Sequence, residues 1–186
     1  MEWMPELKLV WLGGWIPIIL SSSIQWGLLL SMPKDIFSRL FDRKGWSKKQ
    51  QIYFRLGKLI ALVCLVLIIF SPLKTGSPLF IIGALVYSLG LIGLIVSLLN
   101  YRDTPLGKPV TRGLYRISRH PQIVSTTTIV LGICLAIGSW FVFFVLAIAK
   151  LFEHYGILAE EEACLRQYGD SYKLYLKKIP RYFLFF

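Results

Sequence analysis

The sequence predicts an all-α integral membrane protein: a bundle of about five transmembrane helices that ends in a tight helical hairpin and a short cytosolic helix. Apolar residues make up 55% of the 186 residues and charged residues 17%, whereas soluble domains average roughly 45–50% and 25%. Five stretches approach or exceed the length of about 20 apolar residues that crosses a bilayer. This composition argues against a disordered, collagen-like or ordinary soluble protein.

The apolar stretches justify each expected helix in turn. The first runs from about Leu9 to Leu30, and the second from about Ile52 to Phe70. The third, from Leu79 to Leu99, contains no charged residue, and the fourth, from Gln122 to Gly138, is shorter. The fifth begins at Trp140 and continues by helical periodicity to about Tyr168. Because almost no loop separates the last two stretches, they should form a tight hairpin.

Lysine and arginine residues alternate between the two ends of these helices. Segments 31–58, 100–121 and 150–186 hold eight, five and six of the 21 basic residues, and the intervening segments hold one or none. Under the positive-inside rule, this order puts the N-terminus outside and the C-terminus in the cytosol. The formal charge of +11 is therefore interpreted as a topology signal, and no nucleic-acid partner is expected.

The sequence offers little sign of division or of metal chemistry. No internal repeat or low-complexity linker interrupts it, so residues 1–186 are expected to form a single membrane domain. The three cysteines lack C-x-x-C spacing and the chain has only two histidines. Neither a disulfide framework nor a metal centre is therefore expected.

A basic segment, residues 108–121, is the first candidate for chemistry. It ends in Arg119, His120 and Pro121, directly before the fourth expected helix. Taken alone, it is most simply a solvated loop with a helix start, because proline suits the first helical turn. It also combines fixed positive charge, an imidazole and a helix N-terminus, which together suit an anionic group at the membrane surface.

Two acidic or mixed groups follow along the fifth stretch. Glu160 and Glu161 would emerge about 30 Å from its start, since each helical residue rises 1.5 Å. They form either a solvated acidic turn or, opposite Arg119 and His120, a site for ribose hydroxyls or an ammonium group. Lys150, Glu153 and His154 lie deeper on the same helix. They form either a self-neutralised group or the lining of a substrate cavity that reaches into the membrane from the cytosol.

The motifs of the C-terminal half occur together in one known group of proteins. In chain order they are Gly113, Tyr115, Arg119-His120-Pro121, Glu160-Glu161, Tyr168-Gly169-Asp170, Tyr172, Tyr175 and Ile179-Pro180-Arg181. In this pattern, residues 100–186 resemble the isoprenylcysteine carboxyl methyltransferase and phospholipid methyltransferase superfamily of integral membrane enzymes. The first two stretches carry no comparable signature. The resemblance therefore implies a methyltransferase core at residues 76–186, preceded by two further spans in residues 1–75.

The resemblance also implies a reaction and a site. It implies methyl transfer from S-adenosyl-L-methionine to a lipid-like or hydrophobic acceptor, such as an isoprenylcysteine carboxylate, a phospholipid amine or a thiol. The acceptor and membrane lipids are the expected partners, and the active site is expected to be cytosolic. The implied cofactor-binding residues are Gly113, Tyr115, Arg119, His120, Pro121, Glu160 and Glu161. Arg119 and Glu161 are the candidate catalytic residues.

Two other functions remain open from the sequence. Membrane sterol-type reductases that use NADPH are similar in fold and also carry an Arg-His-Pro element, although Glu160 and Glu161 favour the methyltransferase. A non-catalytic membrane scaffold would share the bundle, because fold alone does not establish activity. Binding of S-adenosylhomocysteine or of NADPH distinguishes the two enzymes, and a scaffold binds neither tightly.

Overall fold

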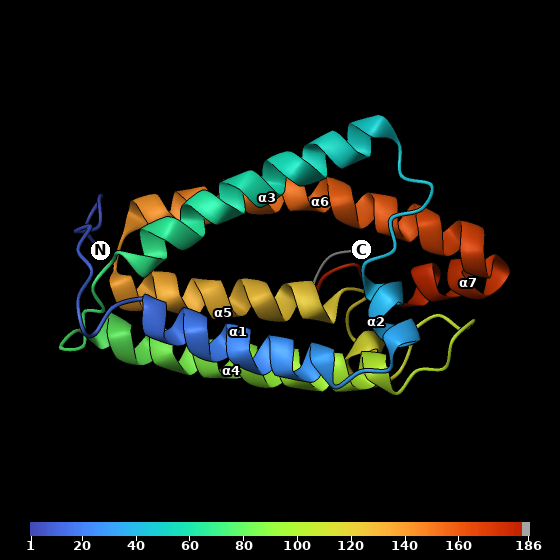
Figure 1. Cartoon of the computed structure of the whole chain (residues 1–186), viewed down its shortest axis with the longest axis horizontal. Coiled ribbons are helices and arrows are strands. Elements are labelled where there is room, and N and C mark those ends of the chain that lie inside the picture. The colour runs from blue at the N-terminus through green and yellow to red at the C-terminus, as the bar shows by residue number, and fades with distance from the viewer. Residues whose placement is uncertain (184–186) are drawn as a thin grey trace.

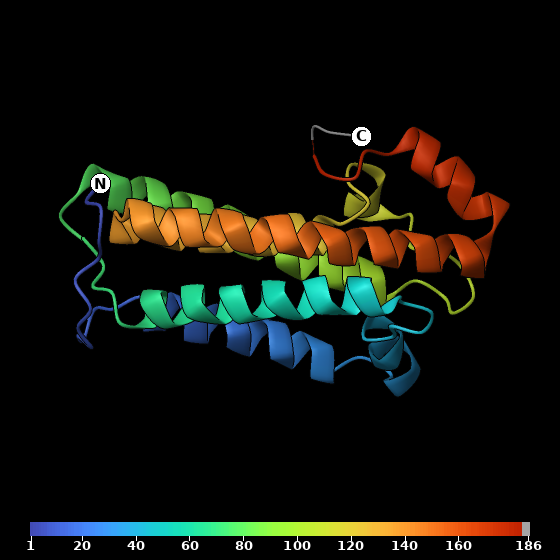
Figure 2. The same cartoon turned by 90° about the horizontal axis from the view of Figure 1, so that it is seen from above.

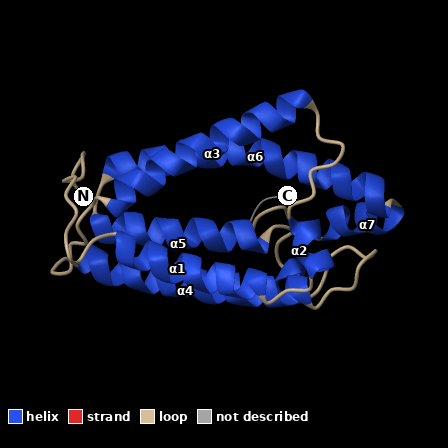
Figure 3. Ribbon diagram, in the orientation of Figure 1, coloured by secondary structure: helices blue, strands red, loops and turns tan. Residues whose placement is uncertain are grey.

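The computed structural model describes residues 1–183, and the regular structure within them is helical (Figures 1 and 3). Its elements are α1 (Trp15–Leu30), α2 (Lys34–Leu40), α3 (Lys48–Ile69), α4 (Pro78–Arg102), the 3-10 turn η1 (Gly113–Arg116), α5 (Pro121–Ile137), α6 (Trp140–Tyr168) and α7 (Asp170–Lys178). The predicted all-α class is confirmed. The short helix after the last long one is α7.

Five of these helices correspond to the five apolar stretches of the sequence. α3, α4 and α6 are each long and apolar enough to cross a membrane, and α1 and α5 are apolar but have only 16 and 17 residues. Large apolar side chains are exposed along four of them, α1, α3, α4 and α6; examples are Trp26, Leu59, Leu89 and Leu151. An outer surface of this kind is suited to contact with lipid tails, in contrast to the exposed face of a soluble bundle.

The first helix begins later than the sequence predicts. α1 starts at Trp15 and not at about Leu9, although residues 9–12 are largely apolar. Those residues form a loop that bonds to the end of α3, where the backbone N–H of Lys8 donates to the carbonyl oxygen of Phe70 at 2.6 Å. The expected start is therefore wrong, because tertiary hydrogen bonds replace the helical ones in this segment.

The second long helix begins earlier than predicted, at Lys48 and not at about Ile52. Ser47 and Gln50 form a capping box, in which each side chain accepts a hydrogen bond from the other residue's backbone N–H. Such a box satisfies N–H groups that a helix start leaves without partners. The short helix α2, which precedes this segment, was not predicted, because its seven residues carry no long apolar pattern.

The long helices form two groups, which Figures 1 and 2 show from two directions. α6 packs along α3, and α5 packs along α4, with α1 also against α4. The predicted tight connection between α5 and α6 is present: Gly138 has a φ of +70° and Ser139 caps α6. From this turn, however, α5 and α6 diverge: α5 packs mainly on α4, and α6 packs mainly on α3. Space for cavities remains between the two groups.

Small residues allow α4 and α5 to approach closely. A side chain at Gly90 would begin 2.6 Å from the backbone nitrogen of Ile129, and one at Gly93 would begin 2.6 Å from the hydroxyl of Ser125. Gly90 and Gly93 therefore mark a close contact between the two helices. The α4–α5 pair forms a firm base for the residues that precede α5.

The connecting segments gather at the two ends of the bundle (Figure 1). At one end, the N-terminal segment meets the α5–α6 turn, where the Glu2 backbone N–H donates to the Gly138 carbonyl at 2.7 Å. Lys74, in the loop between α3 and α4, forms a 2.6 Å ion pair with Glu2. At the other end lie α2, η1 and α7, which belong to the three segments rich in lysine and arginine. The alternation of charge along the chain thus corresponds to two different ends of the molecule.

Candidate active site

Arg119 and His120 lie buried at the N-terminus of α5, with 8% and 6% of their surfaces exposed. Pro121 occupies the first helical position, which requires no N–H donor. The backbone N–H of Arg119 donates to the Pro180 carbonyl at 3.0 Å, and that of His120 donates to the Ser118 hydroxyl at 3.2 Å. The segment after α7 therefore folds back and holds this loop in place.

Glu161, on α6, is the acidic centre of the site and is 5% exposed. Its Oε1 atom lies 3.2 Å from His120 Nε2 and 3.4 Å from Arg119 Nη1. Arg181 donates to both carboxylate oxygens, at 3.1 Å from Nε and 2.8 Å from Nη2. Paired guanidinium–carboxylate bonds of this kind are among the strongest hydrogen bonds in proteins. We call Arg119, His120, Glu161 and Arg181 the Glu161 cluster.

Arg181 was not among the site residues expected from the sequence. It lies in the Ile179-Pro180-Arg181 motif, but only the reversal of the chain after α7 brings it to Glu161. The hydrogen bonds to Glu161 raise the pKa of the Arg181 guanidinium above its usual value, so Arg181 stays charged. The sequence signal that could have identified Arg181 as a site residue was its place in the Ile179-Pro180-Arg181 motif.

One polar atom of the cluster has no partner. Within the described residues, Nε of Arg119 is buried and makes no hydrogen bond. A buried donor without an acceptor costs about 1–3 kcal/mol, so this atom is suited to an acceptor from a ligand. Glu160, by contrast, is half exposed, and its carboxylate lies 3.9 Å from His120 Nδ1. The site thus offers a buried donor on Arg119 and an accessible carboxylate on Glu160 beside His120.

Gly113 and Tyr115 fasten η1 to its neighbours. Gly113 has a φ of +55°, in the left-handed region that favours glycine, and it faces the side chain of Asn100 on α4. Tyr115 is buried; its hydroxyl accepts from Gln122 at 3.0 Å, and its carbonyl accepts from the Tyr175 hydroxyl at 2.7 Å. These contacts tie the loop before Arg119 to α4, α5 and α7.

The three deeper residues of α6 do not form one group. Lys150 and Glu153 form an ion pair at 2.6 Å, with side chains about a quarter exposed. His154 instead contacts the hydroxyl of Tyr182 at 2.8 Å, from its Nδ1 atom. Lys150 and Glu153 line a cavity, whereas His154 is not among its lining residues. No pattern in the sequence indicated Tyr182.

A family model described as phospholipid methyltransferase matches residues 74–171, just over half of the chain. The chain belongs to the phospholipid methyltransferase family. The matched segment runs from just before α4 into the first turn of α7, so it contains Arg119, His120 and Glu161 but not Arg181. No curated protein and no solved structure matches the chain significantly.

Family membership confirms the resemblance found in the sequence, and it makes the chain a member of a family of membrane methyltransferases. The long apolar helices agree with an integral membrane protein. Enzymes of this family generally use S-adenosylmethionine, which carries a carboxylate, an ammonium group and ribose hydroxyls. The unpartnered N–H of buried Arg119 fits the carboxylate, and the accessible oxygens of Glu160 fit the ammonium or hydroxyl groups. The residues present therefore fit this cofactor.

Proposed function

We propose that this protein transfers a methyl group from S-adenosyl-L-methionine to a lipid-like or hydrophobic acceptor at the cytosolic surface of the membrane. The observation that supports this most is the buried Glu161 cluster, with its free Arg119 donor, inside the segment that matches the family. The proposal also includes the domain division, with two added spans in residues 1–75 and the core at residues 76–186.

The proposed orientation puts the N-terminus outside and the C-terminus and the active site in the cytosol. Its support is that the segments rich in lysine and arginine include α2, η1 and α7, which lie at one end of the bundle (Figure 1). The Glu161 cluster lies toward that end, before α5 begins and well along α6. A polar cofactor would therefore enter from water and a lipid acceptor from the membrane.

The cofactor-binding roles divide between charge and shape. Arg119 and His120 would hold the carboxylate, and Glu160 would accept hydrogen bonds from the ammonium group or the ribose. The wall of the cofactor pocket would be shaped by Gly113, Tyr115 and Pro121, because these residues fix the η1 loop and the first turn of α5. When bound, S-adenosyl-L-methionine supplies a methyl group on a positively charged sulfur.

Of the two candidate catalytic residues, Arg119 is the one proposed to act on the reacting groups, and Glu161 is proposed to be a positioning residue. Glu161 already accepts hydrogen bonds from Arg181 and contacts both Arg119 and His120, so it is poorly suited to accept a further proton. Its proposed task is to hold Arg119 and His120 in position. Arg119 then orients the reacting groups, because displacement at a methyl carbon depends mainly on alignment and on exclusion of water.

Binding measurements with the detergent-purified protein test the cofactor assignment. We expect S-adenosylhomocysteine to bind in a calorimeter, and Arg119→Ala to weaken its binding about tenfold or more, as expected for loss of a charged hydrogen bond. Arg116→Ala is the matched control, because Arg116 is an exposed arginine on η1, three residues away. Binding of NADPH in place of S-adenosylhomocysteine would favour the reductase, and tight binding of neither would favour the scaffold.

Methyl transfer itself is tested with membranes that contain the protein. After incubation with methyl-labelled S-adenosyl-L-methionine, extraction separates lipid, protein and volatile products, and we expect label in the lipid or hydrophobic fraction. Arg119→Ala and Glu161→Ala should abolish most of this labelling. Labelling that persists unchanged in both variants would contradict the proposed site.

A further inference from the structure

A basic segment without acidic residues leads into α3. Residues 43–58 contain six lysines and arginines and no aspartate or glutamate. They form the end of the loop before α3 and its first turns, at the end of the helix that the proposed orientation places in the cytosol. Clusters of about four to eight such residues beside the cytosolic end of a membrane helix commonly bind anionic lipids. The side-chain contacts decide whether this segment forms a defined site.

Two of these cations lie against one aromatic ring. The guanidinium carbon of Arg43 lies 4.3 Å from the centre of the Phe54 ring, and the ammonium group of Lys58 lies 5.3 Å from the same centre. Trp46 packs edge-on against Phe54, with ring centres 5.4 Å apart. We call Arg43, Trp46, Phe54 and Lys58 the Phe54 cluster. Because Phe54 lies one turn before Lys58 on α3, the lysine side chain reaches back toward the start of the helix.

The positive charges of the Phe54 cluster have no carboxylate partner. Among the described residues, neither Arg43 nor Lys58 forms an ion pair. Glu153, which lines the same cavity as Lys58, is paired with Lys150 at 2.6 Å. Contacts between a cation and an aromatic ring at an exposed site are weaker than charged hydrogen bonds to phosphate. Both side chains are therefore available to an anionic ligand.

The cluster also contains a buried donor without an acceptor. Nε1 of Trp46 is buried and makes no hydrogen bond within the part of the chain that the structure describes. Because a buried donor is costly to leave unpaired, an acceptor supplied by a ligand would stabilise the cluster. Tryptophan is also enriched where a membrane helix meets the polar surface, since its ring is apolar and its N–H is polar. The position of Trp46 just before α3 agrees with the depth of lipid head groups.

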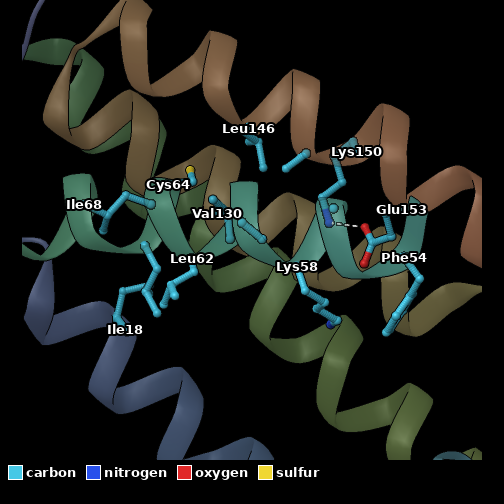
Figure 4. A pocket seen from close by; sticks show the side chains of 14 residues that line it. Ile18, Phe54, Lys58, Leu62, Cys64, Ile68, Val130, Leu146, Lys150 and Glu153 are labelled. Carbon is cyan, nitrogen blue, oxygen red and sulfur yellow. Dashed lines mark hydrogen bonds and ion pairs between the residues drawn. The ribbon is translucent and has the colours of Figure 1, made fainter. Parts of the chain in front are cut away.

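Apolar space begins directly beside the cluster. Phe54 and Lys58 line one end of a cavity of about 340 Å³ between the two groups of helices (Figure 4). Farther along α3, Leu62 and Ile68 line the same cavity, together with Ile18 of α1. The volume lies near the lower end of the range of about 300–1,000 Å³ for ligand sites. A cationic rim beside an apolar interior suits a lipid better than a small soluble anion.

We propose that the Phe54 cluster binds the phosphate group of an anionic phospholipid, and that one acyl chain of this lipid extends into the adjacent cavity. The phosphate contacts Arg43 and Lys58, which joins the loop before α3 to the helix. A lipid with an uncharged head beyond its phosphate, such as phosphatidylglycerol, carries a net negative charge. Phosphatidylcholine adds a cation, and the cluster contains no carboxylate to receive it. This lipid is not the methyl acceptor, since α3 precedes the segment that matches the methyltransferase family.

Lipid retention by the purified protein tests the site. The protein is placed in nanodiscs with equal amounts of phosphatidylglycerol and phosphatidylcholine of different mass, and native mass spectrometry counts the lipids that stay bound after release. We expect preferential retention of phosphatidylglycerol. Arg43→Met and Lys58→Met should each reduce it about fivefold, as for one cation beside an anionic lipid, whereas Arg43→Lys should keep most of it. Arg55→Met is the matched control, because Arg55 is an exposed arginine of the same segment outside the cavity.

The control separates a defined site from general attraction to a charged surface. If Arg55→Met reduces retention as much as Arg43→Met does, the segment acts only through its total charge and the inference is wrong. Equal retention of the two lipids by the natural protein would also overturn it, as would displacement of phosphatidylglycerol by inorganic phosphate. Thermal unfolding establishes that the variants are folded. The inference does not depend on the proposed function, because the lipid can be retained whether or not S-adenosylhomocysteine binds.

Discussion

The two charged clusters on α6 differ in how completely their charges are paired. In the Glu161 cluster, one buried carboxylate is surrounded by two guanidinium groups and an imidazole, and Arg119 Nε is a buried donor without a partner among the described residues. Closer to the start of α6, Lys150 forms an ion pair with Glu153 beside an open cavity, which Lys58 of α3 also lines without an ion pair among the described residues. The first arrangement fixes a loop in one geometry, whereas the second leaves charge available to a ligand. The same residue types thus serve rigidity in one place and recognition in the other.

The two clusters also differ in the helices that build them. The Glu161 cluster is held by α5, which packs closely on α4, and by the chain segment after α7. The cavity lined by Lys58, Lys150 and Glu153 lies between α3 and α6, next to the space where α5 and α6 diverge. α3 precedes the family match at residues 74–171. The family match therefore covers most of the first cluster, while the second depends on a helix outside the matched segment.

The largest effect is expected from removal of Glu161. Glu161→Ala leaves buried Arg119 without its carboxylate, and loss of one partner from a buried ion pair costs about 3–5 kcal/mol. We therefore expect a large drop in thermal stability in detergent and loss of S-adenosylhomocysteine binding. The control is Glu162→Ala, because Glu162 is an exposed neighbour on the same helix. Equal stability of the two variants would contradict the structural role given to Glu161.

Arg181→Met should have a smaller effect, because Arg119 and His120 still contact Glu161. Hydrogen bonds to charged groups contribute about 1.5–3 kcal/mol, and the partial exposure of Arg181, at 22%, reduces this value. We expect moderate destabilisation and weaker S-adenosylhomocysteine binding, measured by thermal unfolding and calorimetry. Arg166→Met, which removes a half-exposed arginine of α6, serves as the control. A loss as large as that of Glu161→Ala would mean that Arg181, and not Glu161, organises the cluster.

The sequence predicted the helices better than their ends, for a physical reason. The bounds of α6 match the prediction, because Ser139 and Gly169 stand at its two ends and the apolar pattern is continuous from Trp140. The start of α1 was wrong, because hydrogen bonds to the end of α3 decide it. Composition reports which segments prefer a membrane, but it carries no information on hydrogen bonds between distant loops.

The candidate site shows the same limit. The rise along a helix predicted that Glu161 would reach the depth of Arg119 and His120, and the structure brings these residues into contact. Arg181 and Tyr182 come to the site only because the chain reverses after α7. No periodicity encodes that reversal. The charge on Lys58 was counted as part of a loop, and only the packing of α3 against α6 reveals the cavity beside it.

The smallest effect is expected from Tyr182, which lines a cavity of about 300 Å³ together with Lys150 and Glu153. Tyr182→Phe removes the hydroxyl that contacts His154 at 2.8 Å but keeps the ring. Loss of one neutral hydrogen bond costs about 1 kcal/mol, so thermal stability should fall slightly. Because the hydroxyl contacts His154 and not the Glu161 cluster, the affinity for S-adenosylhomocysteine should stay within about twofold of the natural protein. A larger loss of S-adenosylhomocysteine affinity would instead mean that the cofactor site extends to the cavity that Tyr182 lines with Lys150 and Glu153.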